Sequence, residues 1–360
     1  MSHSTVKAEF WHFQEDGRIH CDLCPRGCAL KEGQRGLCYV RARQGDEMVL
    51  TTYGLSSGYC VDPIEKKPLN HFMPGTPVLS FGTAGCNLSC RFCQNWDISK
   101  SREMETLSDS APPQLVAHAA KALGCKSVAF TYNDPVIFYE YARDVAQACH
   151  EEGIKTVAVT AGYITDQARS DFFQNIDAAN VDLKGFSEDF YTKLCGGHLQ
   201  PVLDTLVYLN KQTEVWLEVT VLLIPYENDS DKELNQMTQW MYNSLGGDVP
   251  IHFSAFHPDY KLRDKQATTL ATLMRAREIA INNGLKYVYT GNVHHKEGDT
   301  TYCPGCGQAV IVRDWYRLLS YQLTGNRCNS CGCVISGFFE SKPGDWGALR
   351  QPVRLSDFQI

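Results

Sequence analysis

Residues 77–95 of this 360-residue chain read PVLSFGTAGCNLSCRFCQN. A short apolar run, residues 77–81, is followed directly by a loop in which Cys86, Cys90 and Cys93 have the spacing C-x3-C-x2-C. Three thiolates at this spacing can bind three irons of a four-iron cube, so the fourth iron has no protein ligand and can bind a substrate. The loop therefore predicts a reactive [4Fe-4S] site, beside which Phe92 is placed to pack. A zinc site with a missing ligand, or buried structural cysteines, are the alternative interpretations.

The segments after this loop predict an α/β fold. Between residue 77 and residue 291, β-rich apolar runs such as residues 127–132 and 216–224 alternate with amphipathic helical patterns. This alternation is typical of parallel β/α units, and no G-x-G-x-x-G follows the first strand, which disfavours a dinucleotide-binding sheet. We expect about six repeats in a partial TIM-type (β/α) barrel, with the cysteine loop at the carboxyl ends of the strands. The expected domains are a Cys-rich module at 1–75, the barrel at 76–295 and a second cysteine module at 296–360.

Two further cysteine groups flank the predicted barrel. The C-terminal group forms two C-x2-C knuckles with the spacing of a zinc ribbon or a rubredoxin-like site, so it predicts one bound zinc, or one iron. The N-terminal group has the spacing x2-x3-x9, which fits zinc, a second iron-sulfur cluster or reduced thiols equally well. The C-terminal group is Cys303, Cys306, Cys328 and Cys331, with Cys333 as an alternative ligand, and the N-terminal group is Cys21, Cys24, Cys28 and Cys38. The remaining cysteines, Cys60, Cys125, Cys149 and Cys195, are expected to be buried apolar fillers.

Composition restricts the location and the ligands of the protein. The formal charge is -7 and the pI is near 5.9, so no broad basic field favours nucleic acid. No apolar run approaches the roughly 20 residues that span a bilayer, and the first residues lack the pattern of a signal peptide. Sixteen cysteines in a chain of this size indicate metal ligation in a reducing compartment. We therefore expect a cytoplasmic protein that binds neither membranes nor nucleic acid.

The cysteine loop, with its aromatic residue before the third cysteine, resembles the signature of the radical S-adenosylmethionine (SAM) superfamily. The stretch FGTAGCNLSCRFCQNW resembles the branch of pyruvate formate-lyase-activating enzymes. Longer stretches resemble the radical SAM member of the AmmeMemoRadiSam system, named for companions similar to the Memo and AMMECR1 proteins. This resemblance covers most of residues 15–295 and rests on CDLCPRGCAL with GLC, DPIEKKPLNHFMPGTPVLSFGTAGCNLSCRFCQN, TYNDP, VDLKGF and SAFHPDYK. Such families usually have Tyr-Asn-Glu-Pro where this chain has TYNDP.

The resemblance implies a binding site for SAM around the cluster. Asn133 and Asp134 are implied to accept hydrogen bonds from the amino group of SAM, although Asp134 before a proline is also a typical helix cap. His257 is implied to lie near SAM, with a structural role as the alternative.

Alternation along two strands supplies further candidates for the lining of the site. Asp182 and Lys184 share one strand face, where the lysine is expected to pair with a carboxylate, either that of Asp182 or that of SAM. An exposed charge pair at a strand end is the alternative. Glu218 and Thr220 share a face of another strand and are expected to form a polar lining.

The implied function is that of an enzyme. The cluster would cleave SAM reductively to a 5'-deoxyadenosyl radical that abstracts hydrogen from an unidentified small molecule or peptide. The implied partners are a one-electron donor such as flavodoxin or ferredoxin, together with Memo-like and AMMECR1-like proteins. One alternative is a glycyl-radical-enzyme activase, and another is a non-enzymatic zinc or iron-sulfur scaffold that binds RNA or protein.

Overall fold

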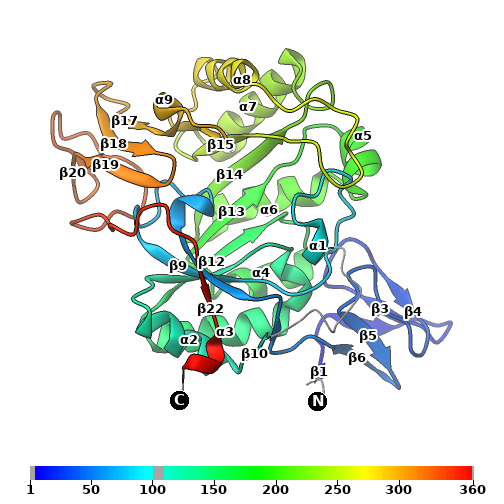
Figure 1. Cartoon of the computed structure of the whole chain (residues 1–360). Helices are drawn as coiled ribbons and strands as arrows, with labels where there is room; N and C mark the ends of the chain where they lie inside the picture. Colours follow the sequence, from blue (N-terminus) through cyan, green and yellow to red (C-terminus); the bar gives the residue numbers. More distant parts are fainter. Residues whose placement is uncertain (1–4, 100–108, 359–360) are drawn as a thin grey trace.

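A nine-stranded sheet forms the centre of this computed structural model, which describes residues 5–99 and 109–358 (Figure 1). Seven strands run parallel and follow one another across the sheet in chain order, unlike the reversed order of a doubly wound sheet. They are β9 (Pro77–Phe81), β11 (Ser127–Phe130), β12 (Lys155–Thr160), β13 (Ala178–Asp182), β14 (Trp216–Leu223), β15 (Ile251–Ala255) and β16 (Val288–Gly291). The alternating strands and helices expected between residues 77 and 291 are confirmed.

Two antiparallel strands extend this sheet beyond β9. Strand β8 (Tyr59–Pro63) pairs with β9, and β22 (Gln351–Val353), close to the end of the chain, pairs with β8. Segments from before and after the parallel strands therefore meet at one edge of the central sheet. The expected domain limits near residues 75 and 295 stay predictions.

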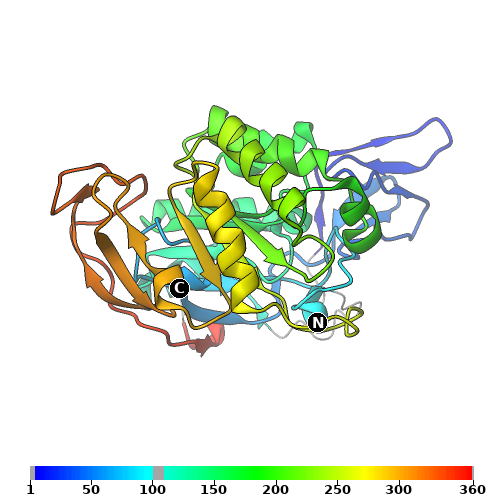
Figure 2. The ribbon, with the colours of Figure 1, turned by 90° about the horizontal axis from the view of Figure 1, so that it is seen from above.

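Helices between successive strands cover the outer face of the sheet (Figure 2). Local signals explain where several begin: a proline starts α2, Ser230 caps α7 by accepting from the Glu233 amide, and Thr269 caps α8 by accepting from the Thr272 amide. The helices are α1 (Trp96–Ser99), α2 (Pro113–Ala122), α3 (Tyr139–Glu151), α4 (Asp166–Phe173), α5 (Glu188–Phe190), α6 (Gln200–Gln212), α7 (Asp231–Leu245), α8 (Leu270–Asn282) and α9 (Lys296–Asp299). Short 3-10 turns lie at Ile64–Lys66, Pro135–Phe138 and Leu355–Asp357, and a π-helical turn at Tyr191–Cys195.

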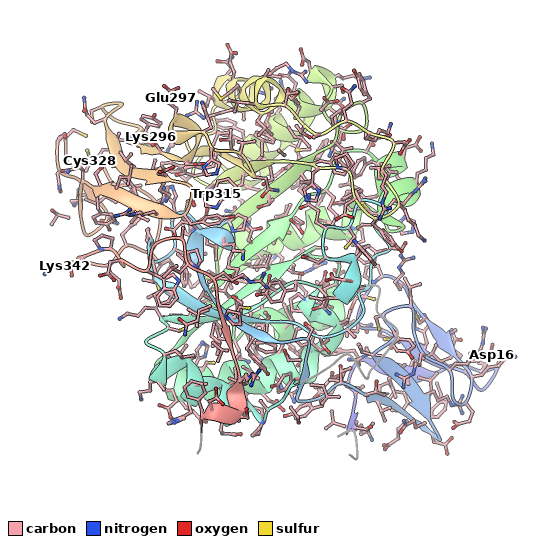
Figure 3. All side chains as sticks on the ribbon, in the orientation of Figure 1. Asp16, Lys296, Glu297, Trp315, Cys328 and Lys342 are labelled. Carbon is pink, nitrogen blue, oxygen red and sulfur yellow. The ribbon has the colours of Figure 1, made fainter. Side chains whose placement is uncertain are left out.

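Two small lobes lie on opposite sides of the sheet (Figures 1 and 2). Figure 3 shows Asp16 at the tip of the N-terminal lobe (residues 5–50), and Cys328 on the outer side of the C-terminal lobe (residues 301–340). The N-terminal lobe contains β1 (Val6–Lys7), β2 (Trp11–Phe13), β3 (Ile19–Cys21), β4 (Ala29–Leu30), β5 (Arg41–Gln44) and β6 (Glu47–Leu50). The C-terminal lobe contains β17 (Thr301–Tyr302), β18 (Ala309–Asp314), β19 (Arg317–Tyr321), β20 (Leu323–Thr324) and β21 (Arg327–Cys328). A separate pair, β7 (Leu55–Ser56) and β10 (Asp109–Ser110), follows the first lobe.

The two lobes differ in how they join the core. Leu23, Leu30 and Val40 of the N-terminal lobe belong to the same buried cluster as the central strands. Val310 and Ile311 of the C-terminal lobe belong to a separate, smaller cluster, which they share with Tyr287 and Tyr289 at β16. Burying apolar surface in one shared core fixes the N-terminal lobe on the sheet.

A buried polar network attaches the C-terminal lobe to the sheet. Arg313 donates to the Asn70 carbonyl (2.6 Å) and to Thr301 Oγ1 (2.9 Å). His71 donates from Nδ1 to the Ser336 carbonyl (2.6 Å), since a carbonyl can only accept, and its Nε2 then accepts from the Tyr289 hydroxyl (2.5 Å). Burial lowers the pKa of His71 to about 4, so this histidine is neutral.

All sixteen cysteines lie in the described part of the chain and none forms a disulfide there. Across residues 5–99 and 109–358, no helix combines the length and the apolar character that crossing a membrane requires.

Candidate active site

A cavity of about 640 Å³ opens at the carboxyl ends of the parallel strands. The three loop cysteines line it, together with residues close to the carboxyl ends of the other strands: Asn133, Asp134, Thr160, Asp182, Lys184, Thr220, Ser254 and Asn292. This is the edge at which parallel β/α proteins build their sites. Another cavity, of about 540 Å³, lies at the amino ends of the strands, beside Lys155, Asp177 and Val215, and no cysteine lines it.

The cysteine loop is held against the end of β11. A Cβ atom on Gly82 would lie 2.3 Å from the Thr131 carbonyl oxygen, so only glycine fits there. Asn133 spans the loop, because its Oδ1 accepts from the Thr83 amide (3.2 Å) and its Nδ2 donates to the Gly85 carbonyl (2.8 Å). Asn133 therefore fixes the backbone that carries Cys86, in addition to lining the cavity.

The π-helical turn supports the loop from a second side. The Ser89 amide donates to the Cys195 carbonyl (2.8 Å), and the Arg91 amide donates to the Leu194 carbonyl (2.8 Å). The side chain of Cys195 contacts that of Cys90. Cys195 was expected to be a filler, and it is buried, but it lies directly against the candidate cluster ligands.

Phe92 lies in the cavity wall as the sequence predicted. Its side chain is buried and its ring centroid lies 5.7 Å from that of Phe190, so packing fixes its position. The loop after β15 closes over the same region: the Lys261 amide donates to the Arg91 carbonyl (3.1 Å), and Trp96 stacks on Tyr260.

Asp134 caps a helical turn and lines the cavity. Its side chain accepts from the Val136 amide (3.1 Å), which caps the 3-10 turn, and also from Thr160 Oγ1 (3.0 Å) and the Ala161 amide (3.1 Å). The helix-cap interpretation is therefore confirmed, while the residue still lines the cavity. Burial raises the pKa of Asp134 to about 6, despite these hydrogen bonds.

Asp182 and Lys184 face the cavity together. Lys184 Nζ lies 2.9 Å from Asp182 Oδ2, so the predicted pairing of the lysine with Asp182 is confirmed. Burial opposes the charged form, but the carboxylate of Asp182 and the sulfurs of Cys90 and Cys195 outweigh it and hold the pKa of Lys184 well above its usual value. The side-chain ammonium of Lys184 thus lies beside the cysteine loop.

Two other predicted residues lie elsewhere. His257 is exposed and does not belong to the described lining of the cavity, although Lys261 in the same loop contacts the cysteine loop. Thr220 lines the cavity as expected. The prediction that Glu218 also lines it is wrong, because Glu218 is fully buried and does not belong to the described lining. Its carboxylate accepts from the Asn70 and His71 amides, Trp216 Nε1 and His252 Nε2.

The wall of the cavity also carries a charged group that the sequence analysis did not assign. Lys67 Nζ lies 2.7 Å from Asp62 Oδ2, and Lys66 Nζ lies 2.9 Å from Asp62 Oδ1. The two lysines line the cavity, whereas Asp62 does not belong to its described lining. Arg350, from the segment just before β22, and Tyr316, from the C-terminal lobe, also line this wall. The DPIEKKP segment supplies the two lysines, and the sequence analysis noted it for another reason. Tyr316 and Arg350, which line the same wall, are distant from it in the sequence.

The C-terminal cysteines form a compact group. The sulfurs of Cys303, Cys306, Cys328 and Cys331 all lie within 4.8 Å of one another, with Cys303 and Cys331 3.5 Å apart and Cys306 and Cys328 3.8 Å apart. Sulfurs bound to one tetrahedral metal at about 2.3 Å are about 3.8 Å apart. Burial opposes ionisation of Cys303, but the backbone amides of Cys306 and Gly305 lower the pKa of this thiol to about 7. The group can bind one metal ion.

The N-terminal cysteines lie outside the large cavity. Cys21, Cys24, Cys28 and Cys38 instead line a small cavity of their own, between the N-terminal lobe and the cysteine loop.

Comparisons with known proteins agree with this geometry. The family model described as the radical SAM superfamily matches residues 81–237, which begin at the cysteine loop. The chain belongs to the radical SAM superfamily. Members of this superfamily use a [4Fe-4S] cluster and SAM.

Relatives of the chain match part of its length and, in one case, nearly the whole length. The uncharacterized protein MJ0808 of Methanocaldococcus jannaschii is 39% identical over 328 residues, which are 91% of this chain and 97% of that protein. The pyruvate formate-lyase 1-activating enzyme of Escherichia coli K12 is 24% identical over 233 residues, 60% of this chain and 93% of that enzyme. The 4-hydroxyphenylacetate decarboxylase activating enzyme of Clostridioides difficile is 23% identical over 225 residues, 57% of this chain and 70% of that enzyme. The superfamily member described here is thus related to activating enzymes of glycyl-radical enzymes.

Proposed function

We propose that this protein is a radical SAM enzyme that cleaves SAM reductively in the 640 Å³ cavity and uses the 5'-deoxyadenosyl radical to take hydrogen from a small molecule or peptide. The observation that carries the proposal is the convergence of Cys86, Cys90 and Cys93 with Asp134 and Lys184 on one cavity. Three thiolates, a carboxylate and an ammonium in one wall match the ligands of a cluster and the two charged groups of an amino acid.

The residues of the cavity fit the cluster that the superfamily implies. Three cysteines from one loop face the cavity, and Lys184 lies near the sulfur of Cys90, where a cation offsets the negative charge of thiolates. When bound, the cluster and SAM supply the one-electron chemistry. Asn133 holds the loop through the Thr83 amide and the Gly85 carbonyl.

The remaining residues orient SAM in this proposal. Asp134 accepts from the SAM ammonium through lone pairs that its three protein donors leave free, and Lys184 donates to the SAM carboxylate. Phe92 and Leu222 provide apolar wall, which excludes water from the reacting centre.

The wider assignment rests on the same site. We propose that the seven parallel strands form a partial (β/α) barrel, that the C-terminal cysteines bind zinc, and that the protein works in the cytoplasm, where thiols without disulfides stay reduced. A flavodoxin or ferredoxin would supply the electron, and Memo-like and AMMECR1-like proteins would act with the enzyme, as the motifs of the AmmeMemoRadiSam type imply.

A second candidate function is activation of a glycyl-radical enzyme, because the chain is 24% identical to the Escherichia coli activating enzyme over 93% of that enzyme. The two lobes, each with four clustered cysteines, favour the first function. Formation of a radical on one glycine of a partner protein does not require such additional cysteine modules. Deuterium transfer from a glycyl-loop peptide, labelled at its glycine, into 5'-deoxyadenosine would favour activation instead.

The test of the proposal is an anaerobic assay for 5'-deoxyadenosine. The wild type, Cys90→Ala and the matched control Cys125→Ala are reconstituted with iron and sulfide, reduced with dithionite and incubated with SAM. Cys125 is buried and does not line the cavity, so its variant controls for the loss of a buried thiol. We expect product from the wild type and the control and none from Cys90→Ala. No product from a wild type with a reduced cluster, shown by EPR, would contradict the proposal and favour the non-enzymatic scaffold.

A further inference from the structure

The N-terminal cysteines surround a small cavity that the proposed reaction does not use. All four line it, together with Arg26 and Arg41. In the described part of the chain, no three of these sulfurs lie within 4.8 Å of one another, in contrast to the C-terminal group. The four are Cys21 at the end of β3, Cys24 and Cys28 in the loop that follows, and Cys38 before β5.

This spacing disfavours a single metal ion. Four sulfurs bound to one zinc at about 2.3 Å are about 3.8 Å apart, as in the C-terminal group. In a four-iron cube each thiolate binds a separate iron at its own corner, so the sulfurs are spread around the cube. A ring of thiols around a cavity, with wider spacing, is the arrangement that a cube needs.

Buried donors around the cavity indicate an anionic ligand. Arg41 is 2% exposed, and its Nε has no hydrogen-bond partner in the described chain; the same is true of Arg26 Nη2. The other nitrogens of Arg41 donate to the Glu140 carboxylate and the Glu9 carbonyl, so the side chain cannot turn away. An unpaired guanidinium nitrogen is costly inside a protein, and the sulfides and thiolates of an iron-sulfur cluster accept hydrogen bonds from such donors.

The cavity adjoins the loop that carries the proposed catalytic cluster, because Asn87 of that loop belongs to its lining. A Cβ atom on Gly85 would lie 1.9 Å from the Cys38 carbonyl oxygen, so the two backbones are in contact. Arg26 Nε donates to the Asn87 carbonyl (2.9 Å). Cys86 lines the large cavity and its neighbour Asn87 lines the small one, while no described residue lines both. A cluster here would be close to the catalytic one but separated from the substrate.

We propose that Cys21, Cys24, Cys28 and Cys38 hold a second [4Fe-4S] cluster that relays electrons to the cluster at the catalytic loop. The second cluster, once reduced, gives one electron to the loop cluster and returns to its oxidised state, and an external one-electron donor reduces it again. The relay role rests on the proposed function, whereas the binding of the cluster does not.

The test uses three full-length variants reconstituted anaerobically with iron, zinc and sulfide. The loop variant changes all three catalytic-loop cysteines to alanine, the N-terminal variant is Cys24→Ala/Cys38→Ala, and Cys125→Ala is the control. Iron, zinc and acid-labile sulfide are counted per chain, circular dichroism checks folding, and EPR is recorded after dithionite reduction.

We expect about eight sulfides per chain in the wild type and the control, and about four in the loop variant and the N-terminal variant. The reduced wild type should show an EPR signal broadened by coupling between two clusters, and both variants a simpler signal. A folded loop variant without sulfide, with or without an additional zinc, would overturn the proposal, even if the N-terminal variant does not fold. A loop variant with a cluster and a wild type without SAM cleavage would instead contradict the proposed function alone.

Discussion

The replacement Lys184→Met tests whether the cavity binds SAM in the proposed orientation. Lys184 Nζ has three N–H donors, one of which is used by Asp182 Oδ2 at 2.9 Å, while the side chain faces the cavity. Methionine keeps the length and apolar stem of lysine but removes the charge. A hydrogen bond between charged partners contributes about 1.5–3 kcal/mol, which corresponds to an increase in the Kd for SAM of about 10- to 150-fold.

The assay is equilibrium dialysis of radiolabelled SAM against protein with an oxidised, reconstituted cluster. Lys184→Arg should lose less affinity than Lys184→Met, because it keeps a cation near Asp182. Lys193→Met is the matched control. Lys193 also pairs with an aspartate, Asp189, but both side chains are mostly exposed. The affinity of this variant for SAM should therefore equal that of the wild type. A Kd for Lys184→Met within about threefold of the wild type, with unchanged iron and sulfide, would refute the assigned orientation.

Three further predictions concern the rest of the structure. Asp134 has a pKa of about 6 and takes up a proton as the pH falls through 6, so the affinity of the wild type for SAM should fall below that pH. Asp134→Asn, dialysed against SAM from pH 5 to 8, should bind weakly at every pH. A variant with the same affinity profile as the wild type would contradict the contact with the SAM ammonium. Glu140→Gln leaves the buried Arg41 charge uncompensated and should lower the free energy of unfolding in urea by about 3–5 kcal/mol. The control Glu47→Gln, at an exposed ion pair, should lower it by less than about 1 kcal/mol. Equal losses in the two variants would contradict a stabilising role of the buried pair. The double variant Cys303→Ser/Cys306→Ser should lose about one metal ion per chain by mass spectrometry yet still cleave SAM, and an unchanged metal content would exclude the C-terminal site.

The sequence was sufficient to predict the parts of the site that depend on local order. Cys86, Cys90 and Cys93 follow the end of the first parallel strand within twelve residues, and Asp134 precedes a proline, so spacing alone located the loop and the cap. Alternation predicted that Asp182 and Lys184 lie on one side, and the two residues do form an ion pair, although β13 ends at Asp182 and Lys184 lies just after it.

Alternation was not sufficient to predict the place of Glu218. It indicates which face of the sheet a side chain lies on, but not whether the side chain reaches the cavity at the end of the strand. The carboxylate meets the amides of Asn70 and His71, nearly 150 positions earlier, below the cavity that Thr220 lines. The same limit applies to Cys38 beside Gly85, and to Cys195 beside Cys90. These contacts join segments that are remote in the chain, and no local pattern indicates them.

Mössbauer spectroscopy of the Cys24→Ala/Cys38→Ala variant, reconstituted with ⁵⁷Fe, tests the central claim most directly. If three thiolates leave one iron open, addition of SAM should change the isomer shift of one of about four irons and leave the others unchanged. A spectrum in which all irons stay equivalent, in a sample that binds SAM by dialysis, would contradict the account.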